Sequence, residues 1–276
     1  MNESVPRFYD ELAEKYHLMF ADWRGEVLAQ GQTLDGLIRQ LAPPGAHTVL
    51  DCACGIGTQA IGLATRGYQV RATDVSIGAL ERAAREAQTF GVSLPVSVAD
   101  FRSLDRQVTQ TFDVVVCLDN AISHLLDDAD LLQAARQMRG RLSPQGLLLV
   151  SIRDYDRLLA PAQTPAADPG LPGVHVHDEQ ARPGGTMPRV FEDEGGRRIA
   201  FQVWTWSSDG RSYRVEQFFL REGDGAYRVS HFSSRFRALR KDELGAALHA
   251  AGFSDIRWHM PAQSGFYQPI VSAMNR

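Results

Sequence analysis

The sequence predicts an α/β protein built on a doubly wound, mainly parallel β-sheet. Between about residues 48 and 152, short apolar runs of strand length alternate with amphipathic stretches of helical spacing. Strands that alternate with helices are joined by right-handed crossovers, which place the strands parallel in one sheet. The chain has 276 residues, 44% of them hydrophobic, so it can bury one ordinary core and still supply a lid or a small second lobe.

The strands of this sheet are expected at five apolar runs, residues 47–50, 68–72, 95–99, 112–118 and 146–152. Two of the stretches between them have helical spacing. The first begins after Ser76 as its N-cap and places four residues on one face, Ile77, Leu80, Ala84 and Ala87. The second follows the acidic residues 127–130, which suit a helix N-terminus, and places four more on one face, Leu131, Ala135, Met138 and Leu142.

Three parts are expected along the chain. Residues 1–45 form an N-terminal helical cap, with helices at 8–20 and 34–41, and residues 46–158 and 238–276 form the core. Residues 159–237 form an insertion that we expect to act as a lid over the substrate. This insertion is a Pro- and Gly-rich loop followed by three antiparallel runs, residues 198–207, 212–221 and 226–237, with the turn dipeptide Asp209-Gly210 between the first two. The chain then returns to the core through a helix at 241–251, stopped by Gly252, and strands near Ile256 and Ile270.

Composition points to a small-molecule partner. The 29 basic and 33 acidic side chains give a net charge of −4, so there is no basic field for binding a nucleic acid backbone. The apolar runs are too short to cross a membrane, and from the acidic, polar residues at the start of the sequence we expect no secretion signal. Three cysteines suit reduced thiols in the cytoplasm.

No metal site is expected from the sequence. Cys52 and Cys54 are two residues apart, but alternation at a strand end points them to opposite faces of the sheet. His175 and His177 lie in the Pro- and Gly-rich loop without a further pair of ligands, and a solvated loop explains them better.

A glycine-bearing loop at the end of the first strand is the strongest functional signal. In the run Asp51-Cys-Ala53-Cys-Gly55-Ile-Gly57, the glycines allow a sharp turn and the close approach of a nucleotide-like ligand. Nicotinamide dehydrogenases share such loops. Asp51, however, would repel a pyrophosphate and attract the ammonium group of a methionine moiety, and Ala60 stands where a third glycine would be.

Acidic residues also end the next two strands. Asp74 is placed to accept hydrogen bonds from both ribose hydroxyls, and Asp100 to accept one from an adenine amino group while Phe101 packs on the ring. Each acid alone is better explained by a turn or a helix cap. Three acids at successive strand ends share one edge of the sheet, and together they predict a cofactor site.

These motifs resemble class I S-adenosyl-L-methionine-dependent methyltransferases, which have a Rossmann-like sheet. The sequence is most similar to glycine N-methyltransferase and the bacterial glycine/sarcosine N-methyltransferases. This closer similarity is carried by five segments, residues 8–13, 51–60, 119–125, 151–155 and 265–271, whereas Leu-Ser-Pro-Gln-Gly-Leu at 142–147 belongs to the resemblance to class I as a whole. It implies S-adenosylmethionine as cofactor, with S-adenosylhomocysteine as product.

The resemblance also implies roles for particular residues. Arg153 would hold a substrate carboxylate, as a guanidinium fork does, and Asn120 would bind the substrate as well; an ion pair with Asp154 or Asp156 is the other explanation for Arg153. Leu118 would line the cofactor. N-terminal aromatic and basic residues would cover the cofactor, and the candidates are Tyr16, Trp23 and Arg24. Phe201 and Phe218 are candidates for the positions where the family has a substrate-binding tyrosine.

The sequence therefore predicts an N-methyltransferase that acts on a small amine or an amino acid such as glycine or sarcosine. His124 would either take the proton of the amine or only cap and pack the turn that follows Asn120. The first alternative is a ring-N-, O- or C-methyltransferase of a specialised-metabolite heterocycle or another hydrophobic small molecule. A non-catalytic protein that senses S-adenosylmethionine and a dehydrogenase are the others. The sequence does not predict the oligomeric state.

Overall fold

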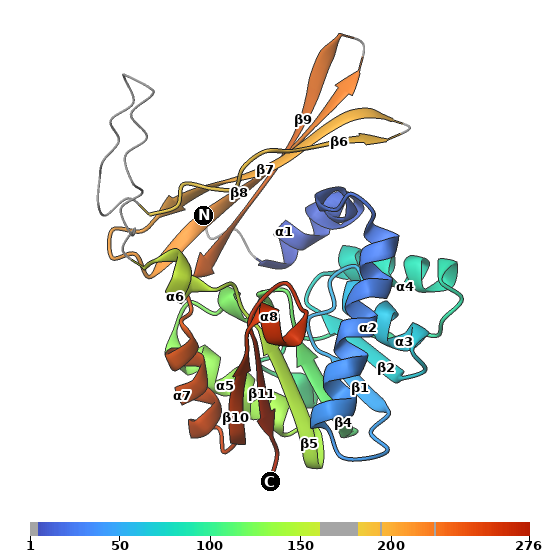
Figure 1. Ribbon diagram of the computed structural model, residues 1–276, viewed down its shortest axis with the longest axis vertical. Helices are drawn as coiled ribbons and strands as arrows, with labels where there is room; N and C mark the ends of the chain where they lie inside the picture. Colours follow the sequence, from blue (N-terminus) through green and yellow to red (C-terminus); the bar gives the residue numbers. More distant parts are fainter. Residues whose placement is uncertain (1–4, 161–181, 194, 224) are drawn as a thin grey trace.

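The computed structural model describes residues 5–160, 182–193, 195–223 and 225–276, and its centre is a seven-stranded sheet (Figure 1). The strand order is β10-β11-β5-β4-β1-β2-β3. The strands are β1 (Thr48–Asp51), β2 (Gln69–Asp74), β3 (Val96–Val98), β4 (Phe112–Cys117), β5 (Leu142–Ser151), β10 (Ser254–His259) and β11 (Ile270–Met274). The first five are parallel, whereas β11 is antiparallel to both of its neighbours. The strand order reverses between β1 and β4, where ligands of such sheets bind.

Helices cover both faces of this sheet. One face packs against α2 (Trp23–Leu41), α3 (Thr58–Thr65) and α4 (Ile77–Thr89), and the other against α5 (Asp128–Arg139) and α7 (Lys241–Ala250). Gly31 and Gly62 bring the backbones of α2 and α3 together, since a Cβ on Gly31 would lie 2.4 Å from the Gly62 carbonyl oxygen. Cys54 is buried on the first face and Cys52 on the second, which confirms that their side chains diverge.

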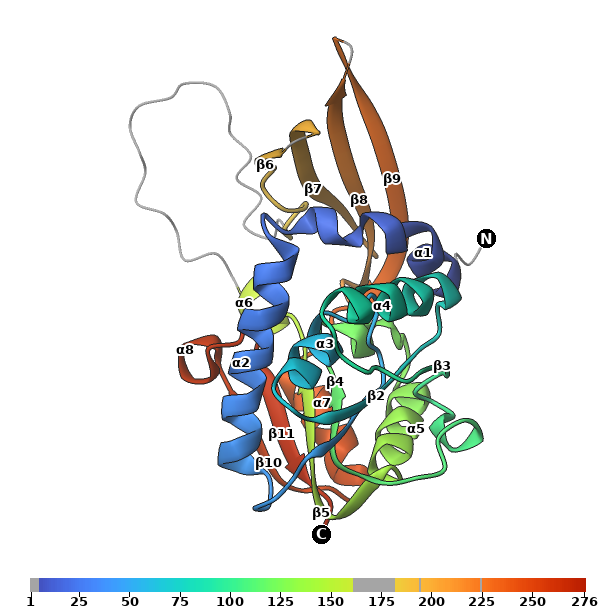
Figure 2. The same ribbon diagram turned by 90° about the vertical axis from the view of Figure 1, so that its right-hand side faces the viewer.

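A second, antiparallel sheet lies over the carboxyl edge of the first, and α1 lies between the two (Figures 1 and 2). Its strands pair in the order β6-β7-β8-β9. They are β6 (Arg189–Asp193), β7 (Gly196–Trp206), β8 (Ser212–Gly223) and β9 (Ala226–Arg237). From α1 (Val5–Leu12), Phe8 and Leu12 pack against Ala200, Phe219 and Phe232 of this sheet. The short helices α6 (Tyr155–Leu158) and α8 (Pro261–Ser264) complete the core.

Most expected elements are present, with corrections at the helices and in the insertion. Ser76 caps α4 through a bond from the Ala79 amide, but Ile77 is 58% exposed and the buried face is made by Ala79, Leu80, Ala83 and Ala87. Leu142 begins β5 rather than ending α5. The helix expected at 8–20 is α1 followed by a 3₁₀ helix, Ala13–Met19.

The expected helix 34–41 is only the end of α2; its first half buries Trp23 and Val27 at helical spacing, but the next turn of the buried face carries Gln30 and Gly31 in place of large apolar residues. Strand β6 falls within the Pro- and Gly-rich stretch where no strand was predicted. His175 and His177 lie outside the described residues. None of the described helices is long and apolar enough to cross a membrane.

Candidate active site

The glycine loop makes a tight turn between β1 and α3. Gly57 (φ 92°) is the N-cap of α3, and Gly55 (φ 53°) lies two residues before it. Both angles fall in the left-handed region that favours glycine. A Cβ on Gly57 would lie 2.9 Å from Ile61 Cδ1, whereas a Cβ on Gly55 would meet open space. The loop therefore needs Gly57 for packing and leaves room for a ligand at Gly55.

Asp51 has a buried carboxylate oxygen without a partner. The residue is 1% exposed, and its Oδ1 accepts a hydrogen bond from the Ala53 amide at 3.2 Å. Its Oδ2 has no hydrogen-bond partner in the described part of the chain. Burial raises the pKa of Asp51 to about 7, against the effect of the Ala53 hydrogen bond. An unpaired buried carboxylate is costly, and a ligand ammonium group would both pair with it and favour its ionised form.

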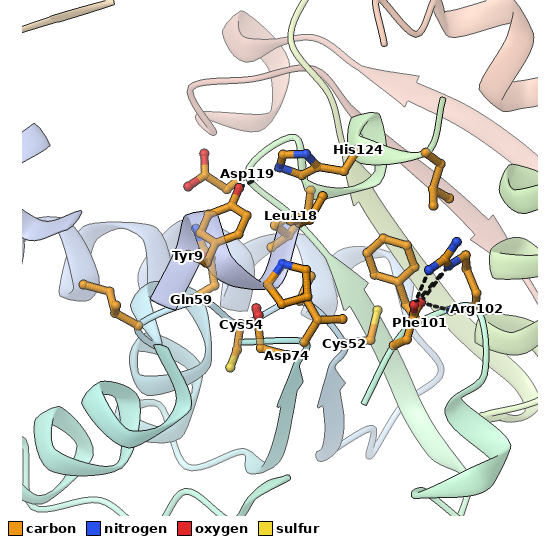
Figure 3. A pocket seen from close by; sticks show the side chains of 18 of the residues that line it. Tyr9, Cys52, Cys54, Gln59, Asp74, Phe101, Arg102, Leu118, Asp119 and His124 are labelled. Carbon is orange, nitrogen blue, oxygen red and sulfur yellow. Dashed lines mark hydrogen bonds and ion pairs between the residues drawn. The ribbon is translucent and has the colours of Figure 1, made fainter. Parts of the chain in front are cut away.

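Asp74 links β2 to the glycine loop. Its Oδ2 accepts from the Gly55 amide at 2.8 Å and its Oδ1 from the Ser76 amide at 2.9 Å. Burial raises the pKa of Asp74, although these backbone bonds oppose the shift. The Asp74 side chain lines a cavity at the carboxyl ends of the strands (Figure 3).

This cavity has a volume of about 220 Å³, and we call it the cofactor cavity because it lies at the edge of the sheet where the sequence predicts the cofactor. Its lining includes seven predicted site residues, Tyr16, Ala53, Asp74, Asp100, Phe101, Leu118 and His124. The Asp100 carboxylate already holds the Arg102 guanidinium at 2.6 Å. Burial tends to raise the pKa of Asp100, but the hydrogen bonds from Arg102 outweigh burial and lower it. An adenine amino group would therefore share Asp100 with Arg102, a partner that the sequence did not indicate.

Trp23 and Arg24 line neither of the two cavities described here and make contacts elsewhere, which goes against the prediction that they cover the cofactor. Asp51, Gly55 and Gly57 do not line these cavities either, but they belong to the loop whose residues Ala53, Cys54 and Ile56 do. The Trp23 ring is buried and its Nε1 donates to Thr58 Oγ1 at 3.0 Å. Arg24 is exposed, donates to Thr89 Oγ1 and lies over the Phe90 ring. The N-terminal segment instead lines the cofactor cavity with Val5, Pro6, Tyr9 and Tyr16.

His124 accepts a hydrogen bond from a tyrosine. The Arg235 carbonyl oxygen lies 3.1 Å from His124 Nδ1, so Nδ1 carries the proton and Nε2 accepts from the Tyr9 hydroxyl at 2.9 Å (Figure 3). Burial lowers the pKa of His124 to about 4. Because the Tyr9 hydroxyl occupies the Nε2 lone pair and burial lowers the pKa, His124 would be a weak proton acceptor, and the structure favours the packing role.

A second, larger cavity of about 660 Å³ lies between α1, α2 and the antiparallel sheet. Arg153 lines it. The Arg153 guanidinium lies over the Trp204 ring, 4.5 Å from its centroid, and donates to the Tyr213 hydroxyl at 3.1 Å. Asp154 and Asp156 pair with Lys241 instead. Among the described residues Arg153 has no carboxylate partner, so the ion-pair explanation for Arg153 is wrong.

Asn120 lines the same cavity, but hydrogen bonds within the protein occupy its side chain. Its Oδ1 accepts from the Arg153 amide and from Ser123 Oγ, each at 2.9 Å, and its Nδ2 donates to the Tyr155 hydroxyl at 3.0 Å. Asn120 therefore holds the backbone of Arg153 in place, and little of its carbonyl oxygen is left for a substrate amine.

Phe201 and Phe218 stack on each other across β7 and β8, with ring centroids 5.1 Å apart. Phe201 lines the larger cavity, whereas Phe218 lines neither of the two cavities. Next to Arg153 lies the Tyr213 hydroxyl, which bonds both Arg153 and Tyr155; Tyr213 is 1% exposed and lines neither of the two cavities. Strand alternation could have suggested Tyr213, because its side chain shares a face of β8 with Val215 and Gln217.

Three residues line both cavities, Tyr9, Tyr16 and Asp119. Asp119 and Asn120 follow β4 with φ angles of 56° and 64°. The Asp119 carboxylate accepts hydrogen bonds from the hydroxyls of Tyr16 and Tyr267. Sequence reasoning did not single out Tyr9, Asp119 or Tyr267, although all three lie in segments that carry the family resemblance. The methyl donor and the methyl acceptor would meet at the junction of the two cavities.

Known proteins similar to this chain are methyltransferases. A family described as a methyltransferase domain matches residues 49–146. The glycine/sarcosine N-methyltransferase of Parasynechococcus marenigrum (strain WH8102) is 34% identical over 203 residues, which are 73% of this chain and 67% of that protein. The glycine N-methyltransferase of Rattus norvegicus is 32% identical over 181 residues, 61% of this chain and 60% of that protein.

Solved structures share the fold over nearly the whole chain. An amino pentose methyltransferase from Micromonospora echinaspora, bound to S-adenosylmethionine, has a TM-score of 0.71 at 21% identity. The match covers 92% of this chain and 94% of that one. A sugar N-methyltransferase from Streptoalloteichus has a TM-score of 0.70 at 22% identity, covering 96% and 94% of the two chains.

The fold, the cavity at the strand ends and these relatives define a methyltransferase. The chain belongs to the class I S-adenosylmethionine-dependent methyltransferases and within them resembles the glycine/sarcosine N-methyltransferases. S-adenosylmethionine is its cofactor. The loop fits this cofactor, since Asp51 has an unpaired carboxylate oxygen and Gly55 leaves room for a ligand.

Proposed function

We propose that this protein transfers a methyl group to the nitrogen of a small amine or amino acid, similar to glycine or sarcosine. The observation that carries the proposal is the Arg153 guanidinium in the larger cavity, which lies over Trp204 and lacks a carboxylate partner among the described residues. A guanidinium held by stacking and one phenol has donors left for a substrate carboxylate. The relatives named for glycine and sarcosine methylation support the same choice.

In this proposal the protein mainly aligns the two reactants. S-adenosylmethionine, when bound, supplies a methyl carbon on a positively charged sulfur. Arg153 and the tyrosines at the junction hold the acceptor so that its nitrogen lone pair faces this carbon, an alignment that is worth about 7–11 kcal/mol in favourable cases. The helices and the antiparallel sheet that line the larger cavity would shield the reactants from part of the solvent.

A bulkier, partly apolar acceptor is the second candidate. The larger cavity holds about 660 Å³, and many of its walls are apolar, among them Phe8, Leu12, Met19, Phe20 and Val215. Glycine would leave most of this space unfilled. A ring-N-, O- or C-methyltransferase of a hydrophobic molecule therefore remains the alternative. A cytoplasmic location, suggested by the three free cysteines, is part of the proposal.

The test is a panel of amino acids, amines lacking a carboxylate, and nitrogen heterocycles, each incubated with isotope-labelled cofactor and followed by mass spectrometry. With a carboxylate substrate, Arg153→Ala should raise KM about 10- to 150-fold, the equivalent of one charged hydrogen bond of about 1.5–3 kcal/mol. The KM for an amine without a carboxylate and the Kd for S-adenosylhomocysteine should stay near the wild-type values. An Arg153→Ala enzyme with unchanged KM values would contradict the amino-acid proposal.

A further inference from the structure

The junction between the two cavities contains one carboxylate. Of the three residues that line both cavities, Tyr9 and Tyr16 are phenols and Asp119 is the acid. Figure 3 shows Asp119 beside Tyr9 at the rim of the cofactor cavity. A nitrogen nucleophile that faces the transferred methyl group must pass this junction, so Asp119 is placed where the acceptor nitrogen has to lie.

The backbone around Asp119 is held in an uncommon conformation. Asp119 and Asn120 both have positive φ angles, and two such non-glycine residues in succession carry a conformational cost. Two hydrogen bonds in series hold this turn. The Asp119 amide donates to Ser151 Oγ at 2.8 Å, and Ser151 Oγ donates to Gln268 Oε1 at 2.9 Å. Packing that maintains a strained turn after a strand is frequent at functional sites.

The Asp119 carboxylate has capacity left for a ligand. Tyr16 donates to Oδ2 and Tyr267 to Oδ1, but each carboxylate oxygen accepts two hydrogen bonds. A second carboxylate, Glu26, accepts from Gln30 Nε2 and lines only the larger cavity, away from the junction. Two other acceptors nearby are more fully used. His124 Nε2 receives the Tyr9 hydroxyl, and Asn120 Oδ1 receives two donors. The ammonium group of a substrate at the junction would therefore find free hydrogen-bond acceptors on the Asp119 carboxylate.

We propose that Asp119 binds the acceptor as an ammonium ion and then takes one of its protons, which leaves the neutral nitrogen facing the methyl group. This inference rests on the proposed N-methyltransferase function and names cationic amines as the substrate class. With Arg153 on the wall of the same cavity, an amino-acid zwitterion would have its carboxylate on Arg153 and its ammonium group on Asp119.

The proton and electron balance is complete without another reactant. A proton passes from the ammonium group to an Asp119 oxygen, and the freed nitrogen lone pair forms the new C–N bond. The C–S bond breaks with its electron pair on sulfur, so the methylated ammonium product and a neutral thioether leave. Asp119 then gives its proton to water.

The electrostatics of the junction suit this role. Burial raises the pKa of Asp119, although the hydroxyls of Tyr16 and Tyr267 and the positive charge of Arg153 oppose the shift. Glu26 adds to the rise, and Tyr9 also faces the carboxylate. A raised carboxyl pKa brings the proton affinity of Asp119 closer to that of an amine, which favours the transfer.

The first experiment is Asp119→Asn in the full-length protein, with exposed Asp105→Asn as the matched control. For the best cationic amine in the panel, we expect Asp119→Asn to lower kcat/KM at pH 7 about 100- to 10,000-fold, the usual contribution of a positioned base. The loss should shrink as the pH approaches the pKa of the free amine, because deprotonated substrate needs no base. The Kd for S-adenosylhomocysteine should change less than about threefold in both variants.

A second variant keeps the carboxylate and changes its basicity. Tyr267→Phe removes one hydrogen bond to the ionised form, so the acidic limb of the kcat/KM profile should move up by about one pH unit. A merely structural role for Asp119 would not move this limb. Wild-type activity and pH profile in Asp119→Asn, or an unmoved limb in Tyr267→Phe, would overturn the inference. If the wild type binds S-adenosylhomocysteine but methylates only alcohols or carbon acids, the proposed function itself fails.

Discussion

Replacing Asp51 by Asn is expected to stabilise the cofactor-free protein and at the same time to weaken cofactor binding. The two effects have one origin. The Asp51 carboxylate is 1% exposed, its Oδ2 lacks a partner among the described residues, and burial raises its pKa from 3.8 to about 7. Ionised Asp51 is therefore unfavourable in the folded protein until a cationic ligand pairs with it.

The stability effect follows from the pKa difference between the folded and unfolded states. Because the folded state binds the Asp51 proton more tightly, the protein loses stability as the pH rises from about 4 to about 7. A shift of about three pKa units corresponds to at most about 4 kcal/mol at pH 8. We expect Asp51→Asn to recover about 1–4 kcal/mol of unfolding free energy at pH 8, and the gain should nearly vanish at pH 4.

The binding effect has the opposite sign. Asp51→Asn removes a charge-assisted hydrogen bond of about 1.5–3 kcal/mol, which should raise the Kd for S-adenosylmethionine about 10- to 150-fold. In the wild type, affinity should rise from pH 6 to pH 8, and binding near pH 7 should release protons, since the ammonium group selects ionised Asp51. Adenosine lacks the methionine part and should bind both proteins equally.

Urea unfolding at pH 4 and pH 8, together with calorimetry in buffers of different ionisation enthalpy, measures both effects. Exposed Asp105→Asn is the control and should change neither stability nor affinity. The reasoning would be refuted by an Asp51→Asn protein that is less stable than the wild type at pH 8 or that binds S-adenosylmethionine as tightly.

Two further predictions concern the glycine loop and His124. Gly57→Ala should lower the unfolding free energy by about 1–3 kcal/mol, because φ is 92° and the added Cβ would lie 2.9 Å from Ile61 Cδ1. Gly55→Ala, whose added Cβ would meet open space, should lower the unfolding free energy by less. Equal losses of unfolding free energy in the two variants, measured by thermal unfolding, would contradict this account. His124→Gln should keep kcat within about tenfold, since a glutamine can accept from Tyr9 and donate to the Arg235 carbonyl; a loss of about 100-fold or more would restore the role of a general base.

The sequence alone determined the parallel sheet and the cofactor edge. Strand and helix periods repeat within a few residues, so the apolar patterns located the five parallel strands and α7. Carboxyl ends of parallel strands share one edge, and for that reason Asp51, Asp74 and Asp100 could be predicted to lie at one edge of the sheet from their positions alone; of the three, Asp74 and Asp100 line the cavity there. The antiparallel runs were also recognisable from strand length and the Asp209-Gly210 turn.

Only the tertiary structure decided which side chains form the acceptor side. Tyr9 meets His124 across 115 residues of sequence, and Tyr267 meets Asp119 across 148 residues. No local period encodes such contacts, because they depend on how α1, β11 and the antiparallel sheet pack over the strand ends. The same packing places Trp23 and Arg24 away from the cofactor cavity and Tyr213 beside Arg153. Local periodicity therefore revealed the donor side of the reaction, and packing over long sequence separations shaped the acceptor side.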